Sequence, residues 1–365
     1  MVLRYLIFFL ICSQLCGKEK IKTYWEENGI IAVDLEDFEA KKPWKKETDL
    51  KGFTGNSYYT WRGPNSYRGA GGGTMEFKII ITKPGDYFLN IHNRHQHHDS
   101  TLENDCYTQM DNGRWVKTFS SKRDVWLWQS THEWDHKKKI PAKYTLSAGL
   151  HIFRISGRSH GFSIDRFHLW HSSLNKKSSQ TTSVKLSASN SPPVPQSITN
   201  KRLISYWNSG RLEMVAREAN VLLKKGENQE AQAALDAIDA FAKKRKAQIE
   251  NLKEFAPSLA YQSLRTLASS LSYTAHEKEI KTELLQLSRD KTFLNNLQAE
   301  KIYIRALDTL EKASNKYIRG KLQPISKRTK ETIARAAKDI KRYSPGSSFY
   351  DDLVARLEKL DFKVE

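Results

Sequence analysis

The stretch that decides the fold is MEFKIIITKPGDYFLNI, residues 75–91. Apolar side chains occupy every second position from 75 to 81, which is the period of a half-buried β-strand. The turn residues Pro84-Gly85-Asp86 follow, and a second apolar run then leads to Ile91. This pattern predicts two β-strands joined as a hairpin.

Short runs of the same kind extend on both sides, from about residue 30 to residue 170. Asp111-Asn112-Gly113 is a strong signal for a second hairpin, and Ser147-Ala148-Gly149 separates two further runs. No helical pattern interrupts them. We therefore expect residues 25–170 to form an all-β domain, a sandwich of the jelly-roll kind.

The second half of the chain changes to helical spacing, and we expect an all-α domain over residues 201–365. The first helix should end at Lys224-Lys225-Gly226. Further helices are predicted near 228–252, 259–273, 277–288, 293–317, 327–343 and 348–360. The turn sequence LLKKGENQEA, residues 222–231, resembles that of one tetratricopeptide unit, but no 34-residue period follows, so an irregular bundle is an equal alternative.

The two halves are separated by residues 171–200, which are rich in Ser, Thr, Lys and Pro. This composition offers little apolar area to bury, so we expect a disordered linker.

Residues 1–17 have the features of a secretory signal peptide. Arg4 precedes an apolar run at 5–12, and small and polar residues follow before Lys18. The run is too short to span a bilayer, although a short N-terminal anchor is an alternative. We therefore expect an exported protein, in the periplasm, the envelope or the extracellular space, with no transmembrane segment in its mature chain.

Two of the three cysteines, Cys12 and Cys16, fall within that signal, which leaves Cys106 alone. The mature chain then has no partner for an intramolecular disulfide. Because Cys106 lies in a strand-like run, we expect a small buried thiol.

The chain is strongly basic, with a formal net charge of +19, which becomes +18 without Arg4. Such a field favours acidic partners, namely anionic polysaccharide, lipid head groups or nucleic acid. Export makes nucleic acid the least suitable of the three. A solvated basic surface without a dedicated ligand is the alternative.

Residues 31–169 resemble the galactose-binding-like carbohydrate-binding modules of the family 6 and 35 lineage and the related C-terminal module of family 115 glycosidases. Each motif alone is weak, and their order and spacing carry the resemblance. The motifs are Val33-Asp34-Leu35-Glu36, Gly72-Gly73 before Met75, Lys83-Pro84-Gly85-Asp86-Tyr87, Leu146-Ser147-Ala148-Gly149, and Gly161-Phe162-Ser163-Ile164-Asp165-Arg166.

The resemblance implies carbohydrate binding on aromatic faces, which bury the apolar side of a pyranose. By position, Tyr67 and one of Trp126 or Trp128 match the pair that sandwiches a sugar in family 6 modules. Ser163 stands where the lineage has Asn, and aromatic residues of a sandwich also form its core. The candidate carbohydrate-binding residues are Tyr59, Trp61, Tyr67, Trp126, Trp128 and Trp134.

The resemblance also implies a structural calcium ion that ties the first strand to the last. Asp34 and Glu36 share one side of a strand, and Asp165 lies in the closing strand, so we predict these three as ligands. As an alternative, Asp165 pairs with Arg158 or Arg166, because an unpaired buried carboxylate is costly.

Two other groups of polar residues were weighed. The segment Asn93-Arg94-His95-Gln96-His97-His98-Asp99 has the residue types of a transition-metal site, but solvated loop histidines are favoured, with Arg94 and Asn104-Asp105 making polar contacts at a ligand rim. Glu103 with Asp105, or Glu133 with Asp135, could form a glycosidase pair only if the two carboxylates face each other across a bond.

We therefore expect an exported, non-catalytic carbohydrate-binding protein whose helical domain mediates assembly or contact with a protein partner. The first alternative is a protein-interaction scaffold with a purely structural sandwich. The second is an enzyme that acts on polysaccharide.

Overall fold

The structure is a computed structural model of the 365-residue chain. It describes residues 22–39, 42–70, 72–99, 102–134, 138–187, 192–226, 228–314, 317–318, 321–322 and 324–364. The expected signal peptide, with Cys12 and Cys16, lies outside the described residues.

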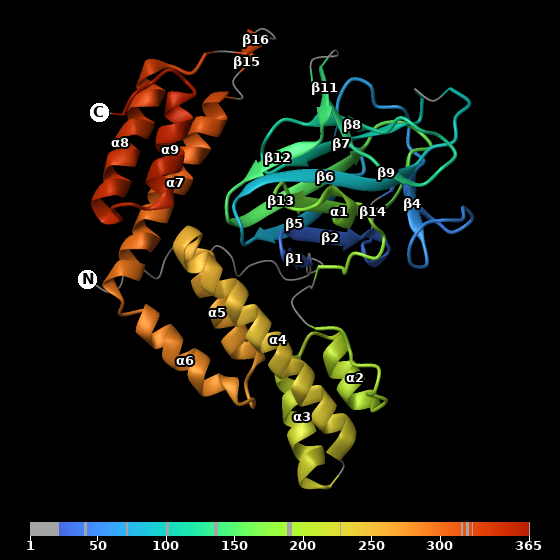
Figure 1. Cartoon of the computed structure of the whole chain (residues 1–365), viewed down its shortest axis with the longest axis vertical. Helices are drawn as coiled ribbons and strands as arrows, with labels where there is room; N and C mark the ends of the chain where they lie inside the picture. Colours follow the sequence, from blue (N-terminus) through green and yellow to red (C-terminus); the bar gives the residue numbers. More distant parts are fainter. Residues whose placement is uncertain are drawn as a thin grey trace.

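Two β-sheets pack face to face in the first half of the chain, which confirms the predicted sandwich (Figure 1). In sheet A the strands follow the order β1 (Thr23–Trp25), β5 (Met75–Ile81), β13 (Gly149–Gly157), β7 (Asp105–Met110), β8 (Val116–Phe119), β10 (Thr131–Trp134) and β11 (Lys138–Pro141). Sheet B has the order β12 (Lys143–Leu146), β6 (Gly85–Arg94), β14 (Ser163–His171), β4 (Tyr58–Trp61) and β3 (Trp44–Glu47), with β2 (Ile30–Asp34) on β14 and β9 (Leu127–Trp128) on β6.

The inner faces of the two sheets enclose one apolar core. All four alternating side chains of β5 (Met75, Phe77, Ile79 and Ile81) are fully buried, as the sequence pattern predicts. The Phe77 ring packs edge-on against Phe167 of β14, with centroids 5.0 Å apart, so the contact joins the two sheets. Cys106 is also buried in this core, as expected.

One predicted hairpin is confirmed and the other is wrong. β7 and β8 pair across the Asp111-Asn112-Gly113 turn. In contrast, β5 and β6 belong to different sheets, so the Pro84-Gly85 turn carries the chain from sheet A to sheet B. The Glu26 carboxylate stabilises this crossing, because it accepts from the Thr82 and Lys83 backbone N–H groups, each at 2.8 Å.

The second half of the chain is helical, as predicted. The helices are α2 (Lys201–Asn208), α3 (Leu212–Lys224), α4 (Asn228–Phe255), α5 (Pro257–Ser270), α6 (His276–Leu287), α7 (Lys291–Ser314), α8 (Lys327–Tyr343) and α9 (Ser348–Glu358). These helices form two clusters. Helices α2 to α6 pack together, and α8 and α9 pack against α7. A two-stranded ribbon of β15 (Tyr317–Ile318) and β16 (Lys321–Leu322) follows α7.

The described part of the segment expected as a linker lies against the sandwich at its start. It contains a one-turn helix, α1 (Lys176–Ser179), and further on Ser187 exchanges hydrogen bonds with Ala32 of β2. Arg166 of β14 also donates to the Thr182 carbonyl at 2.7 Å. These contacts hold residues 182–187 against β2 and β14 of sheet B, and the bounds expected for the linker stay a prediction.

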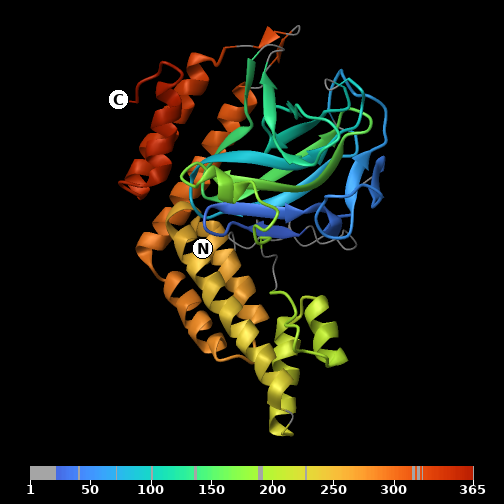
Figure 2. The same ribbon diagram turned by 45° about the vertical axis from the view of Figure 1, so that its right-hand side comes forward.

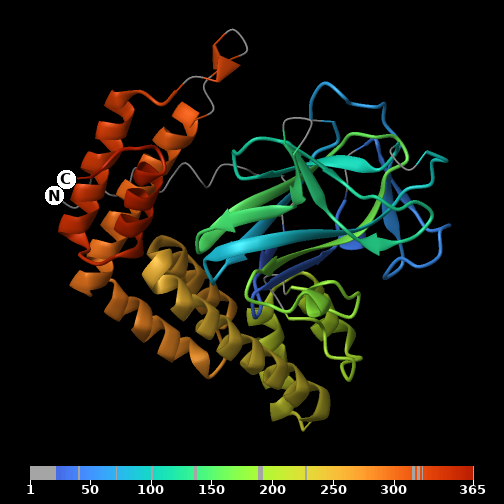
Figure 3. The same cartoon turned by 45° about the horizontal axis from the view of Figure 1, so that its top comes forward.

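The helices form an arc along one side of the sandwich in all three views (Figure 2, Figure 3). α4 contacts the sandwich at β1, where the Arg245 guanidinium lies 3.9 Å above the Trp25 ring. Beside it, Gln248 donates to the Glu26 carbonyl at 2.9 Å, and Lys244 forms an ion pair with Glu27. The two halves therefore share a packed interface that the sequence did not predict.

Candidate functional site

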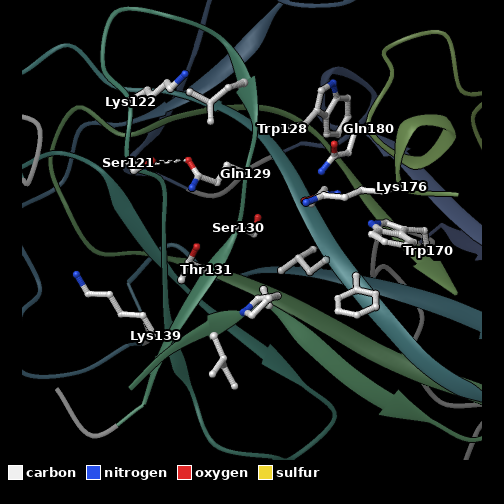
Figure 4. A pocket seen from close by; sticks show the side chains of 17 residues that line it. Ser121, Lys122, Trp128, Gln129, Ser130, Thr131, Lys139, Trp170, Lys176 and Gln180 are labelled. Atoms are coloured by element: carbon white, nitrogen blue, oxygen red, sulfur yellow. Dashed lines mark hydrogen bonds between the residues drawn. The ribbon is translucent and has the colours of Figure 1, made fainter. Parts of the chain in front are cut away.

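An open groove of about 660 Å³ lies on the outer face of sheet B (Figure 4). Five separate chain segments line it, from β6, the loop before β9, β9 to β11, β14 and the region of α1. Its lining residues are Phe88, Leu89, Asn90, Ser121, Lys122, Leu127, Trp128, Gln129, Ser130, Thr131, Lys139, Ile140, Pro141, Ala142, Trp170, Lys176 and Gln180.

Strand alternation explains why this face carries aromatic and polar side chains. Leu89 and Ile91 of β6 point into the core, so Phe88, Asn90 and His92 point outward. On the neighbouring β14, Phe167 and Leu169 point inward in the same way, and His168 and Trp170 point outward.

The floor of the groove is a stacked aromatic pair. Phe88 and Trp170 pack with ring centroids 4.8 Å apart and an interplanar angle of 29°. With the Asn90 amide oxygen oriented toward the indole, it accepts from Trp170 Nε1 at 2.9 Å. Trp170 is only 7% exposed, so it supports the half-buried Phe88 ring, which carries more of the exposed aromatic surface of the floor.

Trp128 of β9 forms a wall of the groove and is half-buried. Its indole stacks on two imidazoles, those of His92 (4.8 Å) and His168 (4.1 Å). Because both histidines rise from the outer face of sheet B, the indole lies over them and its other side is left for the groove. Trp128 is thus held as a flat platform.

Hydrogen bonds fix the backbone around this wall. Asn93 donates through its side chain to the carbonyls of Ile91 and Gln129, at 2.8 and 2.9 Å. Ser130 Oγ accepts from the Ile91 backbone N–H at 2.9 Å, and Gln129 Oε1 accepts from Ser121 Oγ at 2.8 Å. These contacts place amide and hydroxyl groups next to the aromatic floor, which is the combination that sugar hydroxyls require.

Among the described residues, three lysines (Lys122, Lys139 and Lys176) contribute to the lining, and no aspartate or glutamate does. None of the three forms an ion pair with a described residue, although the Lys139 ammonium lies 5.2 Å from the Phe119 ring. Figure 4 shows the Lys176 side chain extending from α1 over the groove. Lys122 and Lys176 give the site a positive potential, whereas Lys139 lies directly across from Glu133 of β10.

The structure separates the six predicted carbohydrate-binding residues. Tyr59 and Trp61 are 5% and 1% exposed and lie in the core, where they present no ring face to a ligand. Their polar atoms bind backbone carbonyls of Phe38 and Pro64. Both residues occupy positions of β4 that face the core. The prediction that they bind carbohydrate is therefore wrong.

Three of the other four predicted residues have described side chains, and only Trp128 lines the groove. Trp126 is half-buried beside it and packs on Tyr58 and His92 at 5.2 and 5.3 Å. Tyr67 is 57% exposed at another part of the sandwich. Trp134 lies in β10, and its side chain is outside the described residues.

Tyr67 belongs to a separate cluster in which every charge is paired. The Arg158 guanidinium lies 5.0 Å from the Tyr67 ring and forms an ion pair with Asp105. Asp105 is 1% exposed and also accepts from Ser159. Asp105 is therefore a buried structural acid here and not an accessible rim or catalytic carboxylate.

The three predicted calcium ligands face different partners. Asp34 pairs with Arg166 at 2.9 Å, and burial raises the pKa of its carboxyl group. Glu36 accepts from the Asn56 backbone N–H at 2.5 Å. Asp165 accepts from Thr54 and from His92 Nδ1, the latter at 2.6 Å.

In this arrangement the Arg166 guanidinium neutralises Asp34, and Glu36 and Asp165 Oδ2 accept hydrogen bonds elsewhere, whereas Asp165 Oδ1 is buried without a hydrogen-bond partner in the described part of the chain. Among the described residues, no group of three or more His, Cys, Asp or Glu side chains could hold a metal ion. The alternative of an arginine ion pair is realised on Asp34 in place of Asp165. Calcium remains a prediction that rests on the family resemblance.

The histidine-rich segment does not form a ligand set either. His95 is fully buried, whereas the rings of His97 and His98 pack together 4.1 Å apart. His97 Nδ1 accepts from the Asp99 backbone N–H at 3.0 Å. The segment is bonded to the neighbouring 120–124 loop, in which Arg123 donates to the His98 carbonyl and the Asp124 N–H to the His95 carbonyl, and its Arg94 is not among the residues that line the groove.

Several groove residues escaped the sequence analysis, namely Phe88, Asn90, Trp170, Lys176 and Gln180, and so did the two histidines beneath Trp128. Phe88 and Trp170 alternate with core residues along β6 and β14, so their aromatic side chains point outward. This alternation could have identified them as groove residues. Lys176 and Gln180 gave none, since they lie in a segment that was expected to be disordered.

No family model matches this chain, and no curated protein matches it. Solved structures do resemble it. A family 35 carbohydrate-binding module from Clostridium thermocellum is 16% identical with a TM-score of 0.29, and the match covers 38% of this chain and 97% of that one. A Podospora anserina GH26-CBM35 β-(1,4)-mannanase is 19% identical with a TM-score of 0.31, over 51% of this chain.

The similar structures thus include both carbohydrate-binding modules and glycoside hydrolases. The match spans 36% of the length of the Podospora mannanase, about a third of that enzyme. Within the described part of the chain, each helix is too short or too polar to cross a bilayer.

Proposed function

We propose that this protein is an exported, non-catalytic carbohydrate-binding protein that holds its ligand in the groove on sheet B. The observation that carries the proposal is the combination in one open site of an aromatic floor, the Trp128 platform and amide and hydroxyl groups. Ring faces bury the apolar side of a sugar, while the polar groups bind its hydroxyls.

We further propose an acidic polysaccharide as the preferred ligand. The described lining contains three lysines, of which Lys139 has Glu133 as its cross-strand neighbour, and the whole chain carries a net charge of +19. A carboxylate or sulfate group on a sugar would meet Lys176 above the groove (Figure 4). Because these lysines are exposed, the attraction should weaken with salt.

The non-catalytic part of the proposal rests on the composition of the groove. Glycoside hydrolysis generally uses two carboxyl groups that flank the scissile bond. No carboxylate among the described residues lines the groove, and Glu133 is in an ion pair with Lys117, whereas Asp135 lies outside the described residues. A reducing-sugar assay on the polysaccharides tested below should therefore show no release above background.

The helical half is proposed to mediate assembly or to contact a partner protein. Support comes from large apolar side chains that are about half exposed on α6 and α7: Leu285, Leu294 and Ile304. Replacing all three with Ser should abolish capture of a partner, or self-association in sedimentation, without lowering glycan affinity. A chain that is monomeric and captures nothing in either form would remove this part of the proposal.

The main experiment measures binding to polygalacturonate and to a neutral galactan by calorimetry, with wild type, Trp128→Ala and Tyr67→Ala. Loss of the Trp128 platform should weaken binding about tenfold or more, as removal of an aromatic anchor does. Tyr67→Ala should bind like wild type, because Tyr67 lies outside the groove. Loss of binding in Tyr67→Ala alone would move the site to the Tyr67 cluster.

The charge preference has its own matched pair. Lys176 lines the groove, whereas the adjacent Lys177 is exposed but does not line it. Lys176→Gln should lower the affinity for polygalacturonate about fivefold at low salt and leave galactan binding unchanged, while Lys177→Gln should change neither. If wild type binds neither polymer, the proposed function is wrong.

A further inference from the structure

His168 lies beneath the groove and contacts two of its parts at once. It belongs to β14 and is 0% exposed. Its ring stacks under Trp128, with centroids 4.1 Å apart and an interplanar angle of 29°. Its Nδ1 lies 2.9 Å from the carbonyl oxygen of Ser179, the last residue of α1.

The hydrogen bond defines the state of the imidazole. A carbonyl oxygen can only accept, so His168 Nδ1 carries the proton and donates it to Ser179. His168 Nε2 is then a buried nitrogen without a hydrogen-bond partner among the described residues. Burial holds the pKa of His168 down at about 4, so the ring is neutral at ordinary pH.

The charges near His168 also oppose its protonation. Arg166 on the same strand and His92 on β6 both lower the pKa of His168. On the side of α1 the nearest ionisable groups in sequence are Lys176 and Lys177, which are also basic. Asp165 is bonded to His92 and Thr54, and no bond joins it to His168.

α1 needs such an attachment because a single turn does not hold itself in place. It supplies Lys176 to the groove, and Gln180 follows directly after it. Ser179 is fully buried at the point where His168 reaches it. Arg166 of β14 also bonds this segment, but at the Thr182 carbonyl, which lies beyond the helix.

His92 supports the same indole but has no such second role. Its Nδ1 binds Asp165 at 2.6 Å, and that carboxylate is held by Thr54. His92 therefore connects Trp128 to the 49–56 loop region of the sandwich and not to α1. Of the two imidazoles under Trp128, only His168 also contacts α1.

We propose that His168 is a positioning residue that sets the Trp128 platform and α1 at a fixed spacing, so that one ligand meets the indole and Lys176 together. This inference rests on the proposed function of the groove. The His168 side chain then has two roles: its flat ring supports Trp128, and its Nδ1–H group holds α1.

Two substitutions separate those roles. His168→Phe keeps a flat ring under Trp128 but loses the hydrogen bond to Ser179. His168→Asn keeps an N–H donor of similar reach but loses the stacked ring. His132→Phe is the matched control, because His132 is another buried histidine of the sandwich and packs against Tyr144, 5.3 Å away, outside the groove.

The probes are polygalacturonate and neutral galactan, with calorimetry as the measurement. We expect His168→Phe to lose about fivefold in affinity for polygalacturonate and under twofold for galactan, because mainly the Lys176 contact is disturbed. His168→Asn should lose about tenfold for both polymers, because the platform is released. His132→Phe should bind both like wild type.

A second measurement needs no ligand. Trypsin cleavage after Lys176 and Lys177, followed by mass spectrometry, should be several-fold faster in His168→Phe than in wild type, His168→Asn or His132→Phe. Equal cleavage in all four proteins, or the same affinity loss in both His168 variants, would overturn the inference. If wild type binds neither polymer the proposed function fails, while the cleavage rates still decide whether His168 holds α1.

Discussion

Trp61 and Trp128 belong to the same sheet and meet opposite environments. Trp61 points inward from β4, is 1% exposed and donates its Nε1–H to the Pro64 carbonyl. Trp128 lies on the outer face over two imidazoles, is half-buried, and lines an open groove. The same residue type therefore serves stability on one side of the sheet and recognition on the other.

The surroundings of the two indoles show the difference in packing. A Cβ atom added at Gly157 would lie 2.1 Å from the Trp61 ring, so backbone contacts that ring directly. Beside Trp128 lie the flexible polar side chains of Lys176 and Gln180 (Figure 4). An aromatic residue is thus evidence for a ligand site only when its strand direction turns it away from the core.

The largest effect that separates the two indoles is on stability. Trp61→Ala removes a fully enclosed ring and leaves a cavity that the surrounding strands cannot fill, so we expect a loss of about 3–5 kcal/mol in the free energy of unfolding. Urea unfolding followed by far-ultraviolet circular dichroism measures it. A loss below about 1 kcal/mol would show that Trp61 does not belong to a packed core.

The next effect is the pH dependence of stability. It arises because Trp128 stacks on a titratable imidazole, that of His168, whereas Trp61 packs in the apolar core. The pKa of His168 is lowered from 6.5 to about 4 by burial, so the unfolded chain binds the proton more tightly than the folded chain. The contribution of His168 to stability is therefore complete above pH 6.5, falls as the pH decreases toward 4, and changes no further below that.

Its magnitude follows from the shift and amounts to about 3 kcal/mol over this window. Between pH 7 and pH 4, the free energy of unfolding should therefore fall by about 3 kcal/mol less in His168→Phe than in wild type. Urea unfolding at each pH measures this difference. His132, whose pKa is also lowered to about 4 by burial, is present in both proteins and cancels in the difference. Parallel pH curves for the two proteins would contradict the buried, neutral state of His168.

Much of the fold follows from local sequence, because alternation and helical spacing are local properties. The predicted helix over residues 327–343 coincides with α8, and the alternation in residues 75–81 places the core side of β5 correctly. The turn at Pro84-Gly85 could not be assigned in the same way. A tight turn is compatible with a hairpin or with a crossing between sheets, and only the long-range pairing of β5 with β13 decides it.

The site was less predictable for two physical reasons. In the β4 sequence YYTW three of four residues are aromatic, so no polar and apolar contrast marks the inward side, and Tyr59 and Trp61 were assigned to the ligand. The groove itself joins five segments that are far apart in the chain, and α1 is one turn long in a Ser- and Lys-rich stretch. Trp128 was found because it lies in an aromatic loop after Arg123.

A smaller effect on stability is expected at the outer indole. Trp128→Ala removes a half-buried ring and its stacking on His92 and His168, each contact of this kind contributing about 0.5–1.5 kcal/mol. The loss should be about 1–2 kcal/mol, well below that of Trp61→Ala in the same urea assay. If the two variants were equally destabilised, the contrast between the faces would be wrong and the binding loss of Trp128→Ala would reflect unfolding.

The smallest effect is expected from calcium, which acts on neither indole if the carboxylates stay with their present partners. Asp34 already has the Arg166 guanidinium as its counter-ion, so a cation at Asp34 would have to replace that ion pair, and Asp165 could offer it only Oδ1 while Oδ2 stays bonded to His92 and Thr54. Melting curves in excess calcium and in chelator should therefore have midpoints within about 1 °C of each other, because a ligand stabilises a fold only if it binds the folded state. A rise of several degrees in calcium that is absent from Asp165→Asn would establish the cation site that the family resemblance implies.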